Sequence, residues 1–269
     1  MSVYRGNEMV EKSPREILNE FKDGKINDSA FMEKLLSLNT SGDETLGIEI
    51  SDILLEMYRT VEGDENADSI HLRHIMEEKL GEKFISKYNV VPREAMALGL
   101  IEMIMQAPLE NDDEIPNIHH VHAAFRIRNK HIFDLDIVEM GCPKVLFLDL
   151  LPFLESLSIT QAGLIEIEGL EKLEKLELLD LAVNFLTDIK GLENLVKLKK
   201  LYVYSNRISH LNGLSKLSKL EELLIHENPI KKLKGIKNLK NLKTIELHDT
   251  HLTEKEIKKI KNLIKNKII

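Results

Sequence analysis

The sequence predicts an all-α helical domain followed by an α/β solenoid with short parallel strands, and two observations lead to this fold class. In residues 132–269, leucine and isoleucine recur with a period of 22 that never shifts register. Such a period is the signature of stacked repeats, each adding one coil to a continuous core. In residues 1–131, apolar residues recur at the three- and four-residue spacing of amphipathic helices. We therefore predict a domain boundary after residue 131.

The first expected helix begins at Ser13, where Pro14 and Glu16 complete the signature of a capping box with proline in the first turn. Four further amphipathic runs follow, the last beginning at Pro92: Phe31/Met32/Leu35/Leu36, Ile50/Ile53/Leu54/Met57, Leu72/Ile75/Met76/Leu80 and Ala97/Leu98/Ile101/Ile104/Met105. We expect antiparallel helical pairs. The acidic stretch Glu110–Glu114 is expected to be a loop, and residues 117–131 to join the two domains.

The charge of the chain is divided unevenly between the halves. Residues 1–131 carry 25 acidic and 15 basic side chains, a net charge of -10, whereas residues 132–269 carry 20 and 22, a net charge of +2. The acidic half is unsuited to nucleic acid, so nucleic-acid binding is unlikely. Residues 231–269 hold twelve lysines against four acidic residues, which leaves polyanion binding as an alternative at that end.

The repeat predicts six units, the first of them degenerate, beginning at Ile132, Leu154, Leu176, Leu198, Leu220 and Leu242. Each unit is expected to supply a short strand whose alternate residues point inward, and then a return segment that buries the remaining leucines. Asn184, Asn206 and Asn228 follow the strands of three units, where an inward amide can bond the backbone of neighbouring coils. A capping box at Thr253 and Glu256 predicts a C-terminal helix that covers the open end. The helical domain is expected to cover the other end.

The units Leu-Thr-Asp-Ile-Lys-Gly-Leu at 186–192 and Ile-Ser-His-Leu-Asn-Gly-Leu at 208–214 carry a family resemblance. Their spacing resembles the 22-residue class of leucine-rich repeat found in the nuclear regulatory subunit of protein phosphatase 1 and in bacterial internalins. The resemblance covers about half the chain and implies a leucine-rich repeat solenoid with a concave strand face. Residues 14–57 look like the helix pairs of HEAT-type repeats.

The sequence supplies no motif of an active site, so we predict that the chain is not an enzyme and assign no cofactor and no metal ligand. It lacks the phosphate-binding glycine loop, the serine elbow and the zinc-protease helix motif. Its single cysteine, Cys142, falls on a core position of the repeat. One cysteine alone cannot form an intrachain disulfide. The run His119, His120 and His122 has no third ligand at a fixed spacing, and His71 with His74 is expected to lie on a helix surface.

The strict period allows the outward positions of the strands to be aligned as two columns. One column contains Val138, Thr160, Ala182, Tyr204, His226 and His248, and its neighbour contains Asp136, Ser158, Asp180, Tyr202, Leu224 and Glu246. Neighbours in a column should lie about 4.8 Å apart. We therefore predict a contiguous aromatic patch ringed by acidic side chains, and assign partner binding to its residues: Tyr202, Tyr204, His226, His248, Glu222, Glu246, Glu227 and Asp249.

These features favour a cytoplasmic protein–protein interaction module or scaffold. Because tyrosines are typical interface anchors and acidic residues surround them, the expected partner is a protein with a basic or mixed polar-apolar surface. Six strands give a face of about 250–400 Å², below the roughly 800 Å² per partner of a standard interface. An alternative is a metal or pH switch at the adjacent His226 and His248. No membrane span is expected, and the oligomeric state is left open.

Overall fold

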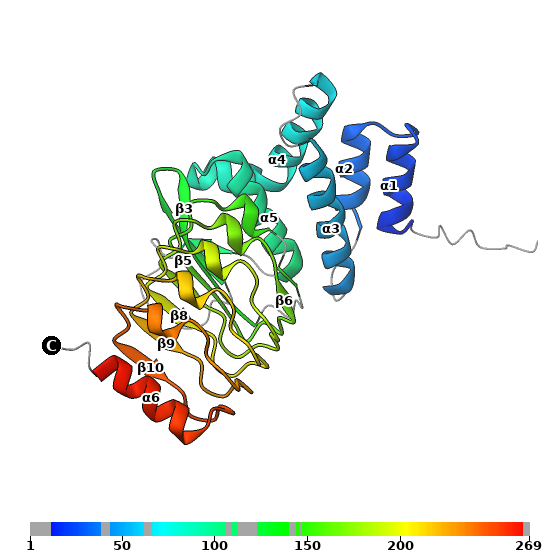
Figure 1. Ribbon diagram of the computed structural model, residues 1–269. Coiled ribbons are helices and arrows are strands. Elements are labelled where there is room, and N and C mark those ends of the chain that lie inside the picture. The colour runs from blue at the N-terminus through cyan, green and yellow to red at the C-terminus, as the bar shows by residue number, and fades with distance from the viewer. Residues whose placement is uncertain are drawn as a thin grey trace, which may run out of the picture.

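The structure is a computed structural model that describes residues 12–38, 44–61, 66–105, 109–111, 123–139, 144–145 and 147–265. In this part of the chain five helices precede the solenoid: α1 (Pro14–Lys22), α2 (Asp28–Leu36), α3 (Glu44–Val61), α4 (Ala67–Tyr88) and α5 (Pro92–Met105). Figure 1 shows α5 against the first coils of the solenoid, with α1 and α2 farthest from it. No helix among the described residues is both long enough and apolar enough to cross a membrane. The predicted order, helices and then solenoid, is confirmed.

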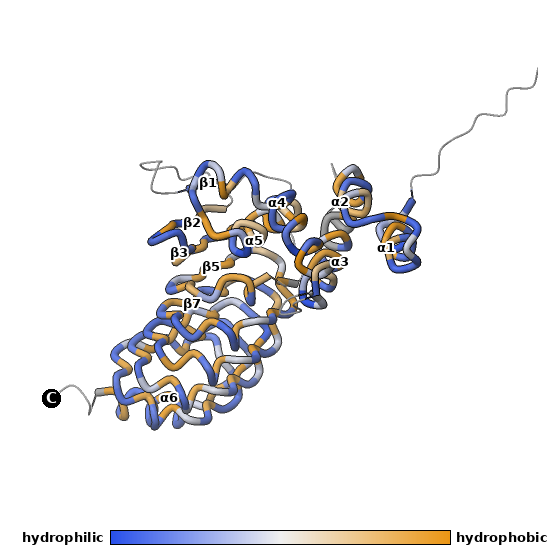
Figure 2. Tube along the Cα trace, turned by 90° about the horizontal axis from the view of Figure 1, so that it is seen from above, coloured by the Kyte–Doolittle hydropathy of each residue, from blue (hydrophilic) through white to orange (hydrophobic). Residues whose placement is uncertain are grey.

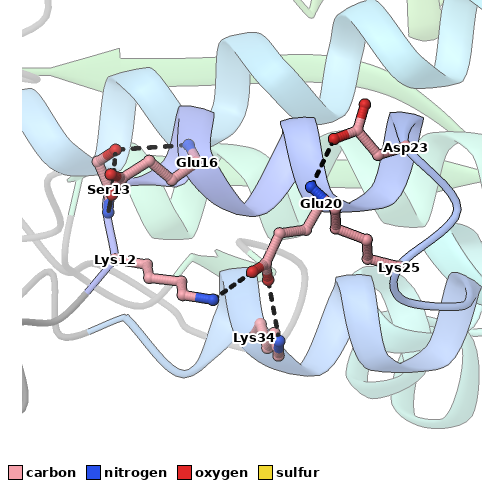
Figure 3. A network of polar contacts seen from close by, with 7 residues as sticks. All are labelled: Lys12, Ser13, Glu16, Glu20, Asp23, Lys25 and Lys34. Carbon is pink, nitrogen blue, oxygen red and sulfur yellow. Dashed lines mark hydrogen bonds and ion pairs between the residues drawn. The ribbon is translucent and has the colours of Figure 1, made fainter.

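The predicted capping box at the start of α1 is confirmed. The Glu16 amide donates to the Ser13 hydroxyl, and the Ser13 amide donates to the Glu16 carboxylate at 2.8 Å. This exchange satisfies amides that the first turn of a helix leaves without partners. Glu20 then links α1 to α2, because its carboxylate accepts from Lys12 and, at 3.1 Å, from Lys34 (Figure 3).

The described strands of the solenoid form one eight-stranded sheet in the order β1-β2-β3-β5-β7-β8-β9-β10. From β3 onward every pairing is parallel, as predicted. The strands from β3 are β3 (His131–Val138), β5 (Ser156–Thr160), β7 (Leu178–Asp180), β8 (Lys200–Tyr202), β9 (Glu222–Leu224) and β10 (Thr244–Glu246). A second, two-stranded sheet pairs β4 (Lys144–Val145) with β6 (Glu166–Ile167) on the return segments.

The sheet begins before the expected first unit, so two expectations are corrected. β2 (Ala123–Arg128) lies where we expected a linker, and β1 (Glu110–Asn111) lies where we expected a loop. β2 pairs antiparallel with β3, and β1 pairs parallel with β2. Asn129 and Lys130 both have positive φ, 52° and 69°, as a two-residue hairpin turn requires. The 22-residue pattern gave no signal for these strands because they do not belong to the repeat.

Five coils return from their strands through a short 3-10 helix, and in the last four of these helices the N-cap is a left-handed glycine. These helices are η2 (Leu148–Leu150), η3 (Leu170–Lys172), η4 (Leu192–Asn194), η5 (Leu214–Lys216) and η6 (Ile236–Asn238). Gly213 has φ +80°, and a Cβ built there would lie 2.8 Å from the Glu193 amide nitrogen of the preceding coil. Glycine therefore serves both the turn and the close stacking of the coils.

The predicted asparagine ladder is confirmed. Asn184, Asn206 and Asn228 are buried, and each amide side chain bonds backbone groups of its own coil and of the preceding one. The Asn206 Oδ1 accepts from the Leu186 amide at 3.0 Å, and its Nδ2 donates to the Leu181 carbonyl at 2.9 Å. In these three coils, the ladder therefore fixes the position at which the backbone leaves the strand.

Both ends of the solenoid are covered, as predicted. At the first end the Phe125 ring of β2 packs edge-on against Phe84 and Tyr88 of α4, with ring centroids 5.8 Å and 5.3 Å away. At the last end α6 (Glu254–Lys265) begins with the predicted capping box and buries Ile260 and Ile264. Figure 2 shows α6 lying across the coils, along which hydrophobic and hydrophilic segments alternate.

A buried carboxyl group joins the helical domain to the solenoid. Glu94 of α5 accepts from the Ile132 amide at 2.6 Å and lies 2.7 Å from Nδ1 of His131. Burial raises the pKa of Glu94, although both contacts act in the opposite direction. The Arg59 guanidinium of α3 adds two bonds to the Asp149 carboxylate at 3.0 Å and 3.1 Å. The two domains are therefore held together by polar contacts as well as by apolar packing.

Candidate binding surface

The predicted columns exist in the structure, because the strands pair in the register that the period gave. Asp180 pairs with Ser158 and with Tyr202, and Leu224 pairs with Tyr202 and with Glu246. Beyond the ends of the strands the ladder of backbone bonds continues: the Ser205 amide donates to the His226 carbonyl, and the Glu227 amide to the His248 carbonyl. We call this outward surface of β3 to β10, with the residue positions that continue it, the strand face.

Three aromatic rings of the strand face form a continuous stack. The rings of Tyr204 and His226 lie 4.6 Å apart at 7°, and those of His226 and His248 lie 4.2 Å apart at 20°. The stack follows from the fold, because parallel strands place equivalent side chains one strand spacing apart. Tyr204 and His226 are partly buried, whereas His248 is exposed at the last strand.

Tyr202 does not join the stack, although the sequence placed it in the same patch. Its hydroxyl donates to the Glu222 carboxylate of the next strand, and Lys200 lies 3.5 Å from the same carboxylate. Burial raises the pKa of Tyr202 and of Tyr204, and in Tyr202 the Glu222 carboxylate adds to the effect. Both hydroxyls therefore keep their protons near neutral pH and act as hydrogen-bond donors.

The acidic residues assigned from sequence lie around the stack. Glu246 Oε2 is 3.3 Å from Nδ1 of His226, and the Glu227 carboxylate accepts from the Ser205 hydroxyl. Glu227 and Asp249 both have positive φ, 53° and 50°, at equivalent positions of two coils. A continuing strand would turn these side chains to the opposite face. The left-handed turn instead places both carboxylates within 4.8 Å of a ring nitrogen of His248.

Sequence reasoning named Asp180 only as a member of a column and gave it no role. Its carboxylate accepts from the Ala182 amide at 2.9 Å, and burial raises its pKa, with the nearby Asp136 acting in the same direction. The carboxyl of Asp180 is partly buried beside Tyr202. A single aspartate on a strand carries no sequence signal of burial, since burial depends on the tyrosines of the next coil.

Other candidates from the sequence lie away from the strand face. The run His119 to His122 and Cys142 lie outside the described residues. His71 and His74 are exposed on α4, as expected. The lysine-rich end supplies exposed side chains on α6, including Lys255, Lys258 and Lys259. The lysine-rich end therefore presents several exposed basic side chains on one helix.

A comparison with protein families identifies the repeat. A leucine-rich repeat family model, described as two copies of the repeat, matches residues 174–216. No curated protein matches the chain. An internalin from Listeria monocytogenes is 27% identical over 45% of this chain and 42% of its own length, with a TM-score of 0.35. This chain thus spans less than half of that internalin.

Two further solved structures match longer parts of the chain. The leucine-rich repeat ectodomain of a receptor kinase from Arabidopsis thaliana is 21% identical over 61% of this chain and 96% of its own, with a TM-score of 0.47. A second internalin from Listeria monocytogenes is 19% identical over 66% and 85% of the two chains, with a TM-score of 0.45. The matched repeats and the parallel sheet make this an all-α domain followed by a leucine-rich repeat solenoid.

Proposed function

We propose that the chain is a protein-binding module that recognises another protein through the strand face of its last three coils. The observation that carries the proposal is the stack of Tyr204, His226 and His248, each of which follows one of three consecutive strands. Solenoids of this kind generally present an extended strand surface to partner proteins. Stacked rings held by neighbouring strands lose little conformational freedom when a partner binds, which favours them as anchors.

The charges around the stack favour a particular kind of partner. Four acidic residues surround the rings: Glu222, Glu227, Glu246 and Asp249. In the described part of this surface, Lys200 forms an ion pair with Glu222. A partner with basic or mixed polar and apolar side chains would meet both the rings and the carboxylates. Such complementarity mainly raises the rate of association and selects among partners.

The size of the strand face sets a limit on the affinity. Its six strands span about 24 Å, and with outward side chains over about 10–17 Å the face covers about 250–400 Å². A standard interface buries about 800 Å² per partner. A stable complex therefore needs contacts beyond the strands, and the helical domain or the loops at the strand ends are placed to supply them. The likeness of α1 to α3 to HEAT-type pairs stays a prediction.

No catalytic role is part of this proposal, and neither is nucleic acid as a partner. Among the described residues, the carboxyl and phenol groups with raised pKa are those of Glu94, Asp180, Tyr202 and Tyr204, and they lie at the domain junction and on the strand face. The acidic helical domain would repel a nucleic-acid backbone. We also keep a cytoplasmic location as a proposal, since a chain with a single cysteine forms no internal disulfide.

Capture from a native lysate with two matched double variants tests the proposal. Tyr204→Ala with His226→Ala removes two rings of the stack, whereas Phe185→Ala with His210→Ala removes one ring and one imidazole from exposed positions outside the strands. We expect the first variant to lose a partner that the second retains, with recovery lower by about thirtyfold, as for a hot spot of about 2 kcal/mol. Melting temperatures control for folding. Equal capture of the partner by both folded variants would exclude the strand face as the binding site.

A further inference from the structure

Two adjacent strands bring three potential metal ligands together at the exposed end of the strand face. Glu246 ends β10 and His248 follows it two residues later, while His226, two residues beyond β9, lies beside His248 with the ring centroids 4.2 Å apart. Each of the three residues offers one ligand atom, and these atoms all lie within 4.8 Å of one another. Two imidazoles and a carboxylate are a ligand set found at zinc sites that leave one position open.

The ring of His226 provides a second, independent observation. Its Nδ1 is buried and makes no hydrogen bond, although it lies 3.3 Å from Oε2 of Glu246. The pair is within ion-pair distance but is not aligned for a hydrogen bond. A buried ring nitrogen without a bond is unfavourable. A cation between the nitrogen and the carboxylate would satisfy both atoms.

The distances suit an ion of the size of zinc. Zinc bonds nitrogen and carboxylate oxygen at about 2.0–2.2 Å, so neighbouring ligand atoms of a tetrahedral site lie about 3.3–3.5 Å apart. The distance from His226 Nδ1 to Glu246 Oε2 is already 3.3 Å. Calcium and magnesium prefer oxygen ligands, whereas imidazole suits zinc, copper and nickel. The ligand set therefore selects a transition metal ion.

One rearrangement is needed before both imidazoles can bind the same ion. A metal ion lies in the plane of the imidazole that binds it, yet the rings of His226 and His248 are stacked 4.2 Å apart at 20°. One ring must therefore turn to aim a nitrogen at the space between them. His248 is exposed, so its ring can rotate without displacing the core.

Two more carboxylates raise the negative charge at this position. Glu227 and Asp249 form a second group with His248, again with ligand atoms within 4.8 Å of one another. Both belong to the left-handed turns that follow the strands, so the fold itself places them there. Their charges attract a cation to the site.

We propose that His226, Glu246 and His248 bind one divalent transition metal ion of the zinc class on the strand face. The fourth position remains for water or for a donor group of a bound molecule. The site does not depend on the proposed protein partner, because its three ligands belong to this chain alone. It also differs from the cysteine-based zinc clusters that a chain with one cysteine cannot form.

Calorimetric titration of the full chain, free of any purification tag, with zinc chloride tests the site. We expect one equivalent to bind, and the variant Glu246→Gln with His248→Gln to bind it at least about tenfold more weakly. The control variant, His71→Gln with His74→Gln, removes two exposed imidazoles from α4 and should bind as the wild type does. Absence of binding by the wild type at millimolar zinc would overturn the proposal.

Two further measurements keep the test decisive. Zinc binding that survives unchanged in the folded variant would place the ion elsewhere, for example at the run His119 to His122, and would also overturn the proposal. If the double variant does not fold, Glu246→Gln alone remains usable, because this side chain is 47% exposed. Cobalt in place of zinc should give the strong visible absorption of a tetrahedral ion, and Glu246→Gln should alter that spectrum. An unaltered spectrum would exclude Glu246 as a ligand.

Discussion

Replacing Asn206 with alanine should reveal how much the asparagine ladder contributes to the stability of the solenoid. The Asn206 Oδ1 accepts from the Leu186 amide at 3.0 Å. Its Nδ2 donates to the carbonyls of Leu181, Val203 and Tyr204 at 2.9–3.2 Å. The side chain is buried, so water does not replace these bonds easily when the amide is removed.

The four hydrogen bonds of Asn206 do not contribute equally to the stability of the folded state. The Leu181 carbonyl also accepts from Asn184, the Val203 carbonyl from Asn228, and the Tyr204 carbonyl from the Val183 amide, so each keeps a partner. The Leu186 amide has no other hydrogen bond in the described structure. A buried amide left without its bond costs about 1–3 kcal/mol, and the weakened shared bonds add to this. We expect a loss of about 2–3 kcal/mol.

Denaturant titration of the full chain measures this loss, with Asn194→Ala as the matched control. The Asn194 side chain is exposed and makes a single hydrogen bond, to the Glu171 carbonyl at 3.4 Å, so its loss should change stability by less than about 0.5 kcal/mol. The melting temperature of Asn206→Ala should fall by about 5–10 °C, since 1 kcal/mol corresponds to about 2–4 °C at this chain length. Equal midpoints for the two variants would refute the structural role of the ladder.

Three other predictions concern the coils and the domain junction. Gly213→Ala should destabilise the chain by at least about 1 kcal/mol more than Gly163→Ala, because both have positive φ but only the first meets a neighbouring coil at 2.8 Å; equal unfolding midpoints would contradict this. The raised pKa of Glu94 means that the folded state binds the proton of this carboxyl more tightly than the unfolded state does. The resulting contribution to folding stability is present at low pH and is lost as pH rises through the raised pKa. The stability advantage of the wild type over Glu94→Gln should therefore shrink with rising pH in denaturant titrations, and a widening difference would reverse the reasoning. Arg59→Ala should lose about 0.5–1 kcal/mol by removing two bonds to Asp149, and added salt should reduce this loss; a loss unaffected by salt would exclude the ionic contribution.

The regular part of the fold was predictable because its period fixes several things at once. A period of 22 assigns the recurring leucines to the core, the outward strand residues to columns, and Asn184, Asn206 and Asn228 to the exits from three strands. The structure confirms these assignments down to individual pairs, such as Tyr202 with Leu224 and Leu224 with Glu246. Because the same pattern of inward-facing apolar residues recurs in every coil, the pairing register of neighbouring strands is strongly determined.

The parts that escaped prediction lie where the repeat stops or where tertiary contacts decide. The hairpin of β2 and β3 depends on the turn at Asn129 and Lys130, which does not recur in the repeat. Tyr202 stands outside the aromatic stack because its neighbours in its own column are Asp180 and Leu224, and its hydroxyl donates instead to the Glu222 carboxylate. The role of Glu94 at the junction of the two domains required knowledge of which helix meets the first coil.

The candidate surface was predictable in its members but not in its detailed chemistry. Alignment of the columns alone brings Tyr204, His226 and His248 together. The sequence also placed Glu227 and Asp249 around this patch, but strand alternation gives no reason for that position, since it assigns them to the other face. The left-handed backbone at Glu227 and Asp249 explains why their carboxylates lie beside His248.

Site-specific photo-crosslinking tests the central claim, that the strand face binds a protein, most directly. A photoreactive phenylalanine derivative in place of Tyr202 should crosslink a defined protein in native lysate, whereas the same residue in place of Phe185, exposed outside the strands, should not. An excess of unlabelled wild type should compete for the crosslink, and Tyr204→Ala with His226→Ala should not. Equal crosslinking from both positions, or equal competition by both proteins, would contradict the assignment of the strand face as the binding surface.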